Sequence, residues 1–312
     1  MQGYAKLVSK DPEGALKDFN KYLLLNPENA DGYYGRASAK FNMLDLRGAL
    51  EDYNRSLSLD STNSLVYAGR AICRVKLKDY YGGIKDFTKA ADLGYKHMYR
   101  DRGDVKVILK DYAGAIEDYT RVIKQFRHDY LSYDARGYAR WLSDDFEGAF
   151  KDYNTAIELN PRYDKVFIHK GDALAALGFA SAYKEAVLDY STAIEIDPEN
   201  FQAYFKRGAV KGILGDHRGA ILDYSESITI YPFDEVVFYH RGLSKNEIKD
   251  YDGALRDYNS SIDLNPKLAD AFHNRGVIKI IKKDKDGGCL DLSKAGELGS
   301  KTAYDAIKAL CR

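Results

Sequence analysis

The strongest constraint on this chain is that its sequence repeats. The stretch GAFKDYNTAIELNP at 148–161 recurs 105 residues later as GALRDYNSSIDLNP at 253–266. The same register is found along the chain in units that are mostly 34 residues long. A period of roughly 20 to 50 residues is typical of arrays in which each unit buries its apolar face against its neighbours. The 105-residue offset is three units plus three residues, which predicts an insertion, and the extra residues lie between Gly171 and Ala186.

Each unit has the pattern of two helices. Aromatic residues recur at positions 4 and 24, and small residues recur at positions 8 and 20, which gives one apolar stripe to each helix. Small residues at facing positions allow two antiparallel helices to approach closely. Most units end in a proline, which disfavours helix in the residue before it. We therefore expect an all-α fold of stacked antiparallel helix pairs.

The predicted domain organisation is a single array over residues 1–312. Its repeats are predicted at 1–29 (partial), 30–63, 64–95, 96–129, 130–163, 164–200, 201–234, 235–268 and 269–300. Residues 301–312 align with the first helix of a further unit, but Lys308 replaces the small residue of position 8, so we expect a capping helix there. The first unit begins at about its position 6, so we expect that upstream sequence, or a processed leader, is missing. Two locations are compatible with the sequence: the cytoplasm, or export from the cell with removal of a leader.

This arrangement of small and aromatic positions, with proline near position 32, resembles the tetratricopeptide repeat. The resemblance covers essentially the whole chain, although several units, among them those from Ser64 and Ala269, lack the proline. It implies an α-α superhelix of about nine repeats plus the capping helix. It also implies a concave groove, lined by the first helices, that holds protein or peptide partners. The residue patterns of the repeats that clamp chaperone tails, and of those with an asparagine ladder at position 6, are absent from this sequence.

A pair of charged positions accompanies the repeat. Position 7 is basic in every whole unit (Arg36, Arg70, Arg102, Arg136, Lys170, Arg207, Arg241, Arg275) and position 23 is acidic (Asp18, Asp52, Asp86, Asp118, Asp152, Asp189, Asp223, Asp257, Asp291). These positions lie at similar heights in an antiparallel hairpin. We therefore predict a ladder of bidentate pairs, within a unit or between neighbours, that sets the packing register. The alternative is a row of cations that binds phosphates.

Composition and motifs exclude several function classes. Lys plus Arg and Asp plus Glu both total 47, so the chain lacks the net basic character of a nucleic-acid binder. Cys73, Cys289 and Cys311 are odd in number and far apart, so we expect neither a disulfide framework nor a zinc cluster. The stretch GELGSKT at 296–302 departs from a phosphate-binding loop, and no nucleophile motif is present. We expect no enzymatic activity, no cofactor and no metal.

The resemblance places partner contacts on the first helix of each unit. The residues projected onto the groove are Tyr34, Phe41, His97, Arg100, Tyr138, Trp141, His169, Phe205, Lys206, Tyr239, His240, His273 and Asn274. Aromatic and long basic side chains are common anchors of protein interfaces. We expect a non-enzymatic scaffold that binds protein or extended peptide, without nucleic acid and without membrane insertion. Three alternatives stay open: these residues pack between first helices, the chain self-associates into a homo-oligomer as a structural subunit, or it is a regulatory array from a larger protein.

Overall fold

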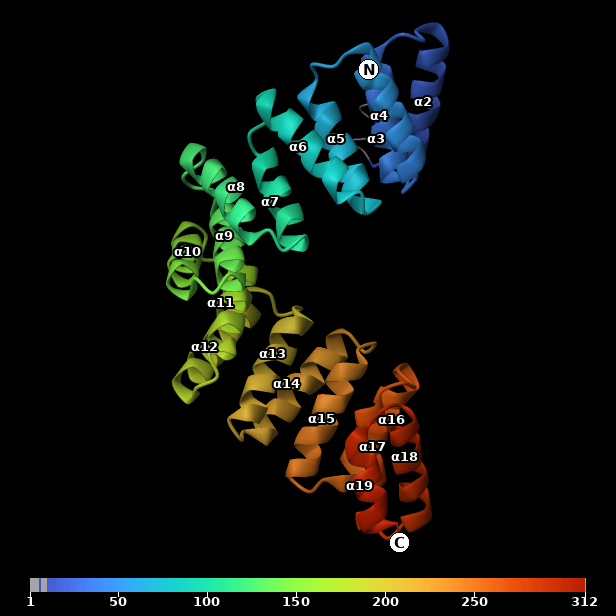
Figure 1. Ribbon diagram of the computed structural model, residues 1–312, viewed down its shortest axis with the longest axis vertical. Helices are drawn as coiled ribbons and strands as arrows, with labels where there is room; N and C mark the ends of the chain where they lie inside the picture. The colour runs from blue at the N-terminus through green and yellow to red at the C-terminus, as the bar shows by residue number, and fades with distance from the viewer. Residues whose placement is uncertain (1–5, 7–9, 312) are drawn as a thin grey trace. The chain divides into compact units, whose positions relative to one another are not determined.

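A computed structural model describes residue 6 and residues 10–311 of the chain. The described residues form α-helices joined by turns, without β-strands (Figure 1). This confirms the all-α fold of paired helices. Residues 1–5 and 7–9 of the predicted partial repeat, and Arg312 of the predicted cap, lie outside the described residues.

The chain divides into two compact units, Met1–Leu159 and Asn160–Arg312, and each is treated by itself. The first contains α2 (Pro12–Leu25), α3 (Ala30–Asn42), α4 (Leu46–Leu59), α5 (Ser64–Lys76), α6 (Tyr80–Asp92), α7 (Met98–Ile108), α8 (Tyr112–Gln125), α9 (Tyr130–Leu142) and α10 (Phe146–Leu159). The second contains α11 (Asp164–Ala176), α12 (Ala180–Ile196), α13 (Phe201–Ile213), α14 (His217–Ile230), α15 (Glu235–Glu247), α16 (Tyr251–Leu264), α17 (Ala269–Ile281), α18 (Lys285–Glu297) and α19 (Lys301–Leu310). The predicted repeat boundaries, and the prediction of one continuous array, stay predictions.

Within each unit, consecutive helices pack as hairpins, and each hairpin packs on the next one along the chain. The packing of α15 on α16 shows why positions 8 and 24 are restricted. The ring of Tyr258 is fully buried and lies against Gly242, where an added Cβ would be only 2.7 Å from the ring. The same contact recurs at four further pairs, with separations of 2.7–2.9 Å: Gly103–Tyr119, Gly137–Tyr153, Gly171–Tyr190 and Gly208–Tyr224. A larger residue at position 8 would displace the aromatic ring from the core.

The turn inside each hairpin except α11–α12 follows an Asp-x-x-Gly pattern. At the start of α16, the carboxylate of Asp250 accepts a hydrogen bond of 2.9 Å from the backbone N–H of Gly253, which satisfies one of the free N–H groups of the first turn. The preceding residue, Lys249, has a φ of +62°, the left-handed conformation that ends the first helix. Equivalent aspartate caps begin α2, α4, α6, α8, α10, α14 and α18.

The hairpin of α11 and α12 is the irregular one. The predicted insertion does not form an extended loop, because α12 has 17 residues and continues the second helix of the repeat at its N-terminal end. Its N-cap residue is Phe179, which is 53% exposed and makes no side-chain capping hydrogen bond. The chain enters this helix through Gly178, at a φ of +78°.

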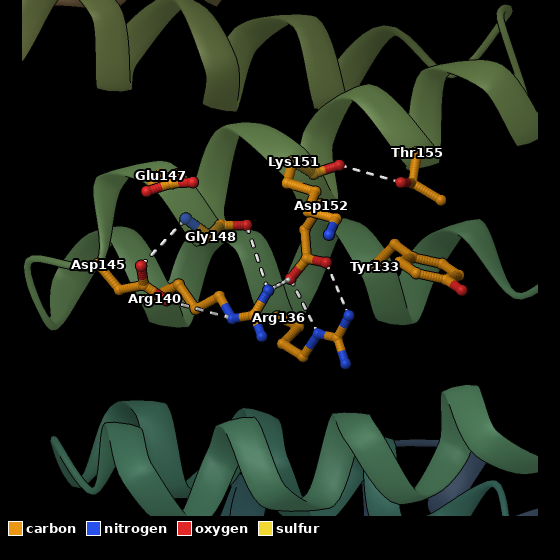
Figure 2. A pocket seen from close by; sticks show the side chains of 9 residues that line it. All are labelled: Tyr133, Arg136, Arg140, Asp145, Glu147, Gly148, Lys151, Asp152 and Thr155. Atoms are coloured by element: carbon orange, nitrogen blue, oxygen red, sulfur yellow. Dashed lines mark hydrogen bonds and ion pairs between the residues drawn. The ribbon is translucent and has the colours of Figure 1, made fainter.

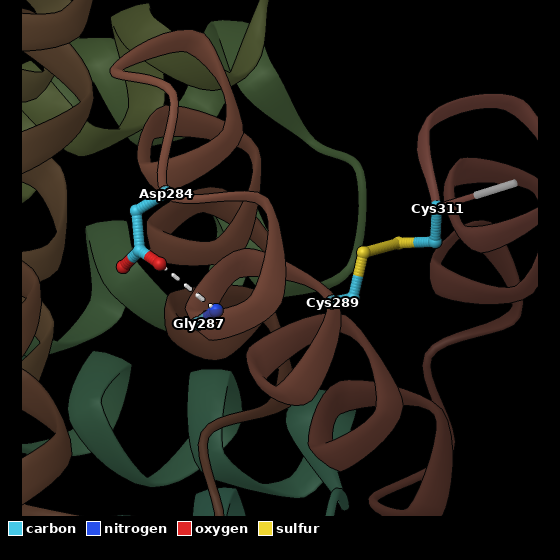
Figure 3. Close-up of a disulfide and its surroundings, with 4 residues drawn as sticks. All are labelled: Asp284, Gly287, Cys289 and Cys311. Carbon is cyan, nitrogen blue, oxygen red and sulfur yellow. Dashed lines mark hydrogen bonds between the residues drawn. A yellow bond between two sulfur atoms is a disulfide. The ribbon is translucent and has the colours of Figure 1, made fainter.

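The expectation that the cysteines form no disulfide is wrong. Cys289 in α18 and Cys311 at the end of α19 are joined by a disulfide, with their Cα atoms 5.8 Å apart (Figure 3). The odd number and wide spacing of the cysteines did not reveal this bond. It forms because α19 folds back onto α18 and brings together two residues that are 22 positions apart in sequence. Cys73 is the free cysteine of the described residues, and it is fully buried.

Candidate functional site

The predicted ladder of charges is confirmed, and its pairs form within a repeat. In the α9–α10 hairpin, Nε of Arg136 donates to one oxygen of Asp152 at 2.8 Å and Nη2 donates to the other at 2.7 Å. Six more repeats have this two-bond arrangement: Arg36–Asp52, Arg70–Asp86, Arg102–Asp118, Arg207–Asp223, Arg241–Asp257 and Arg275–Asp291. The aspartates are almost completely buried, so each carboxylate depends on its cations for solvation.

Each of these aspartates has a second cation that the sequence analysis missed. A lysine or arginine at position 11, one turn after the first arginine, contacts the same carboxylate at 2.7–2.9 Å. The pairs are Lys40–Asp52, Arg74–Asp86, Lys106–Asp118, Arg140–Asp152, Lys211–Asp223, Lys245–Asp257 and Lys279–Asp291. The recurrence of a basic residue at position 11 was the signal that could have revealed this contact.

The arginine of position 7 also links neighbouring repeats. Nη1 of Arg241 donates a hydrogen bond of 3.0 Å to Ser225, at position 25 of the preceding repeat, and its guanidinium lies 5.6 Å from the ring centroid of Phe238. The same reach backwards is made by Arg36 to Asn20, Arg70 to Asn54, Arg102 to Thr88, Arg136 to Thr120, Arg207 to Ser191 and Arg275 to Asn259. One side chain therefore fixes both the hairpin and its junction with the previous hairpin.

The irregular repeat has an incomplete form of this arrangement. Lys170 replaces the arginine and contacts Asp189 through a single interaction of 3.3 Å, while Leu174 occupies position 11. Within the described residues, the second carboxylate oxygen of Asp189 is buried without a hydrogen-bond partner. Burial raises the pKa of this carboxyl, and the nearby Lys170 only partly opposes the shift.

A pocket of about 540 Å³ lies beside the ladder in the α9–α10 hairpin (Figure 2). Its lining residues are Tyr133, Arg136, Arg140, Asp145, Glu147, Gly148, Lys151, Asp152 and Thr155. The two arginines converge on Asp152, and Arg140 also donates to the carbonyl oxygen of Gly148 (Figure 2). The three cations of the wall are matched by three carboxylates, so the pocket has no net positive charge to attract an anion. This argues against the phosphate-binding alternative for the arginine row.

The predicted partner residues of the first unit divide into packing residues and accessible ones. Tyr34 and Phe41 pack on the core cluster around Tyr53. The imidazole of His97 stacks on Phe126, with a centroid separation of 4.0 Å. These three side chains serve the contacts between helices, which is the packing role left open by the sequence.

Two other predicted residues of the first unit lie together on α9. Tyr138 is 37% exposed, and its ring centroid is 5.8 Å from that of the half-buried Trp141. The neighbouring first helix, α7, contributes Arg100, which contacts the carboxylate of Asp129 at 3.3 Å. We name Tyr138 and Trp141 the α9 aromatic pair.

On α7, two carboxyls that were not predicted as site residues accompany Arg100. Burial raises the pKa of Asp101 and of Asp104, and the hydroxyl of Tyr119 donates to Asp104 at 2.7 Å. They were missed because aspartate is common throughout this chain.

The predicted residues of the second unit form a contiguous row across successive first helices. The His240 ring on α15 lies 5.6 Å from that of Phe205 on α13 and 5.5 Å from that of Tyr239. The amide of Asn274 on α17 donates to the hydroxyl of Tyr239 at 3.1 Å. Burial lowers the pKa of His240, so its neutral form is favoured.

The three other predicted residues of this unit lie around that row. Lys206 is paired with Asp172 of the preceding first helix at 2.8 Å, and His169 is half-buried on α11. Within the described residues, Nδ1 of the half-buried His273 has no hydrogen-bond partner. The structure thus links Phe205, His240, Tyr239 and Asn274, in that order, through successive pairwise contacts.

Two features are absent from the described part of the chain. Among its helices, none combines the length and the apolar character needed to cross a membrane. No cluster of three or more His, Cys, Asp or Glu side chains among these residues is arranged to hold a metal ion.

Comparison with known proteins supports the repeat assignment. A family model described as a TPR repeat matches residues 181–212, which extend from α12 into α13. The chain therefore contains a tetratricopeptide repeat. No curated protein matches this repeat protein.

Solved structures similar to this repeat protein have the same fold at low sequence identity. YrrB, described as a TPR protein with an unusual peptide-binding site, is 22% identical over 61% of this chain and 97% of its own, with a TM-score of 0.54. PilF of Pseudomonas aeruginosa is 15% identical over 69% of this chain and 96% of its own, with a TM-score of 0.60. A tetratricopeptide repeat protein from Parabacteroides merdae is 16% identical over 80% of this chain and 99% of its own, with a TM-score of 0.54. The comparisons indicate no catalytic family.

Proposed function

We propose that this protein is a non-enzymatic scaffold that binds protein or extended peptide segments across its first helices. The observation that carries the proposal is the α9 aromatic pair, in which one of the predicted partner residues, Tyr138, is an exposed aromatic side chain. An exposed tyrosine beside a half-buried tryptophan offers a large, rigid contact area with little loss of side-chain entropy on binding.

Two further observations support this function. The arginines of position 7 are hydrogen-bonded to aspartates of their own repeats. The other side chains of the first helices are therefore the variable surface. YrrB, which is similar in structure, is described as having a peptide-binding site on this fold. The fold is in general a protein-interaction scaffold.

The test is a peptide-display selection on the purified protein, followed by calorimetric affinities for the selected segments. We expect Tyr138→Ala with Trp141→Ala to weaken binding by roughly thirtyfold, as for a central interface anchor, with helicity and melting nearly unchanged. The matched control is Tyr81→Ala on α6, an aromatic side chain that is 77% exposed on a second helix of the same compact unit. Equal affinities for the parent and the double variant would refute the proposed site, and a large loss of stability would assign the pair to the core.

A second candidate function is that of a structural subunit that self-associates. One specific observation favours it. Three leucines on second helices, each at position 22 of its repeat, are 67–72% exposed: Leu188, Leu222 and Leu290. Replacing all three by serine is expected to convert an oligomer into a monomer in light scattering if this candidate is correct. A monomeric parent protein at micromolar concentration would refute it.

A further inference from the structure

The C-terminal helix α19 buries few of its own side chains against the rest of the protein. It has 10 residues, and isolated helices shorter than about 12 residues are marginal in water. Ala303 is the one buried residue of this helix within the described part of the chain. The hydroxyl of Tyr304 donates to the carbonyl oxygen of Gly296 at 3.2 Å, although the Tyr304 side chain is 55% exposed. Noncovalent contacts therefore leave the docking of α19 on α18 weak.

The disulfide supplies the missing constraint. It joins Cys289, in the first half of α18, to Cys311, directly after the last residue of α19, and so connects the far end of the short helix to the hairpin (Figure 3). Closing a loop of about twenty residues favours the ordered state by roughly two orders of magnitude in equilibrium constant. The covalent bond, rather than packing, decides whether α19 stays docked.

The disulfide between Cys289 and Cys311 is accessible to thiol exchange, whereas the thiol of the third cysteine is not. Cys289 and Cys311 are both partly exposed, so a small or protein thiolate can reach the bond. Cys73 is fully buried, and burial raises the pKa of its thiol to about 11, so it supplies little thiolate to compete in exchange. The three cysteines thus separate into one exchangeable pair and one inert residue.

We propose that Cys289 and Cys311 form a redox latch, which holds α19 on α18 when oxidised and frees the helix when a dithiol protein of the thioredoxin class reduces it. In the opening step, a thiolate of the reductant attacks one sulfur of the bond and the other cysteine leaves as a thiolate that takes up a proton. The second thiol of the reductant then closes the reductant's own disulfide and releases the first cysteine as a thiol. Two electrons and two protons are transferred to the pair, and an oxidised protein of the same class takes them back when the latch closes.

Release of α19 would uncover the surface of α18 around Gly296. The ring of Tyr304 covers this glycine, whose ideal Cβ would lie 3.1 Å from the ring. The latch therefore controls access to the last hairpin, at a place distinct from the α9 aromatic pair. This inference does not depend on the proposed function, because neither the bond nor its exposure involves a partner.

The test is hydrogen–deuterium exchange of the full chain, purified without reductant, before and after treatment with a dithiol. We expect the amides of residues 303–310 to exchange about a hundredfold faster after reduction, with the amides of α13 unchanged as an internal reference. The double variant Cys289→Ser with Cys311→Ser should exchange rapidly without reductant, whereas Cys73→Ala should behave as the oxidised parent does.

Three outcomes would overturn the latch. The first is alkylation of both Cys289 and Cys311 in the untreated protein, which would show that the bond does not form. The second is unchanged exchange of residues 303–310 on reduction, which would show that packing alone holds the helix. The third is an equal acceleration in α13, which would show a global loss of stability instead of a local release.

Discussion

At the scale of single residues, glycine has two different roles in this protein. Gly242 is required because the ring of Tyr258 occupies the space where a Cβ would lie. Gly212, in the last turn of α13, is different, since a Cβ there would meet no atom closer than 3.9 Å. The sequence shows the two as the same residue type, and only the neighbouring ring distinguishes them.

This difference gives a matched pair of substitutions. Gly242→Ala is expected to destabilise the protein by about 1 to 3 kcal/mol, because the buried ring must move. Gly212→Ala is expected to stabilise it by up to about 1 kcal/mol, because alanine loses less backbone entropy in a helix. Thermal melting followed by circular dichroism should separate the two variants in opposite directions. If both changed the melting temperature equally, the packing explanation of position 8 would be wrong.

His240 is expected to make the stability of the folded protein depend on pH. Burial lowers its pKa in the folded state below the ordinary value of 6.5, so the unfolded chain binds a proton more readily. Its contribution to stability is therefore present above pH 6.5 and is lost as the pH falls through the lowered folded-state pKa. We expect His240→Gln to reduce the loss of melting temperature between pH 7 and pH 5. An identical pH profile for the variant and the parent would exclude this histidine as the cause.

At the scale of the helical element, the α11–α12 hairpin is the exception to the ladder. A regular hairpin such as α13–α14 surrounds Asp223 with Arg207 and Lys211, but Asp189 has the single contact with Lys170. A buried carboxylate with one cation has lost most of the interactions that offset its desolvation. Its aspartate therefore contributes less to folding than the equivalent residue of the other hairpins.

The two aspartates can be compared by the same substitution. Asp223→Asn is expected to cost roughly 3 kcal/mol, because it leaves Arg207 and Lys211 without their carboxylate. Asp189→Asn is expected to change the stability by less than about 1 kcal/mol at neutral pH, since it also removes a poorly solvated charge. The raised pKa of Asp189 means that its destabilising effect is relieved as the pH falls towards 3.8, and this relief should vanish in the variant. Urea unfolding at pH 7 and pH 4.5 measures both effects, and equal costs at the two sites would contradict them.

At the scale of the whole chain, the sequence predicted the fold because the fold consists of local contacts repeated many times. The arginine and aspartate of one pair are 16 residues apart, and seven copies of the pattern made the pairing evident. The disulfide could not be predicted in the same way, because it occurs once and no other repeat shares it.

The candidate site was less predictable than the fold, for a physical reason. Side chains on the first helices lie at the junctions between hairpins, so the same position can serve packing in one repeat and stay accessible in another. His97 stacks on Phe126, whereas Tyr138 is exposed, although both were assigned to one surface. Exposure depends on what the neighbouring hairpin places opposite, and a repeat consensus does not contain that information.

The backward reach of the position 7 arginine has a consequence for how such a chain can change over generations. Its partners lie in its own repeat and in position 25 of the preceding one, as for Arg241 with Asp257 and Ser225. An in-frame duplication of one 34-residue unit would therefore supply a new repeat together with every polar partner that it needs on both sides. Gain or loss of whole repeats becomes a small mutational step, whereas a change of residue at position 7 or 11, as at Lys170 and Leu174, leaves a defect of the kind found around Asp189.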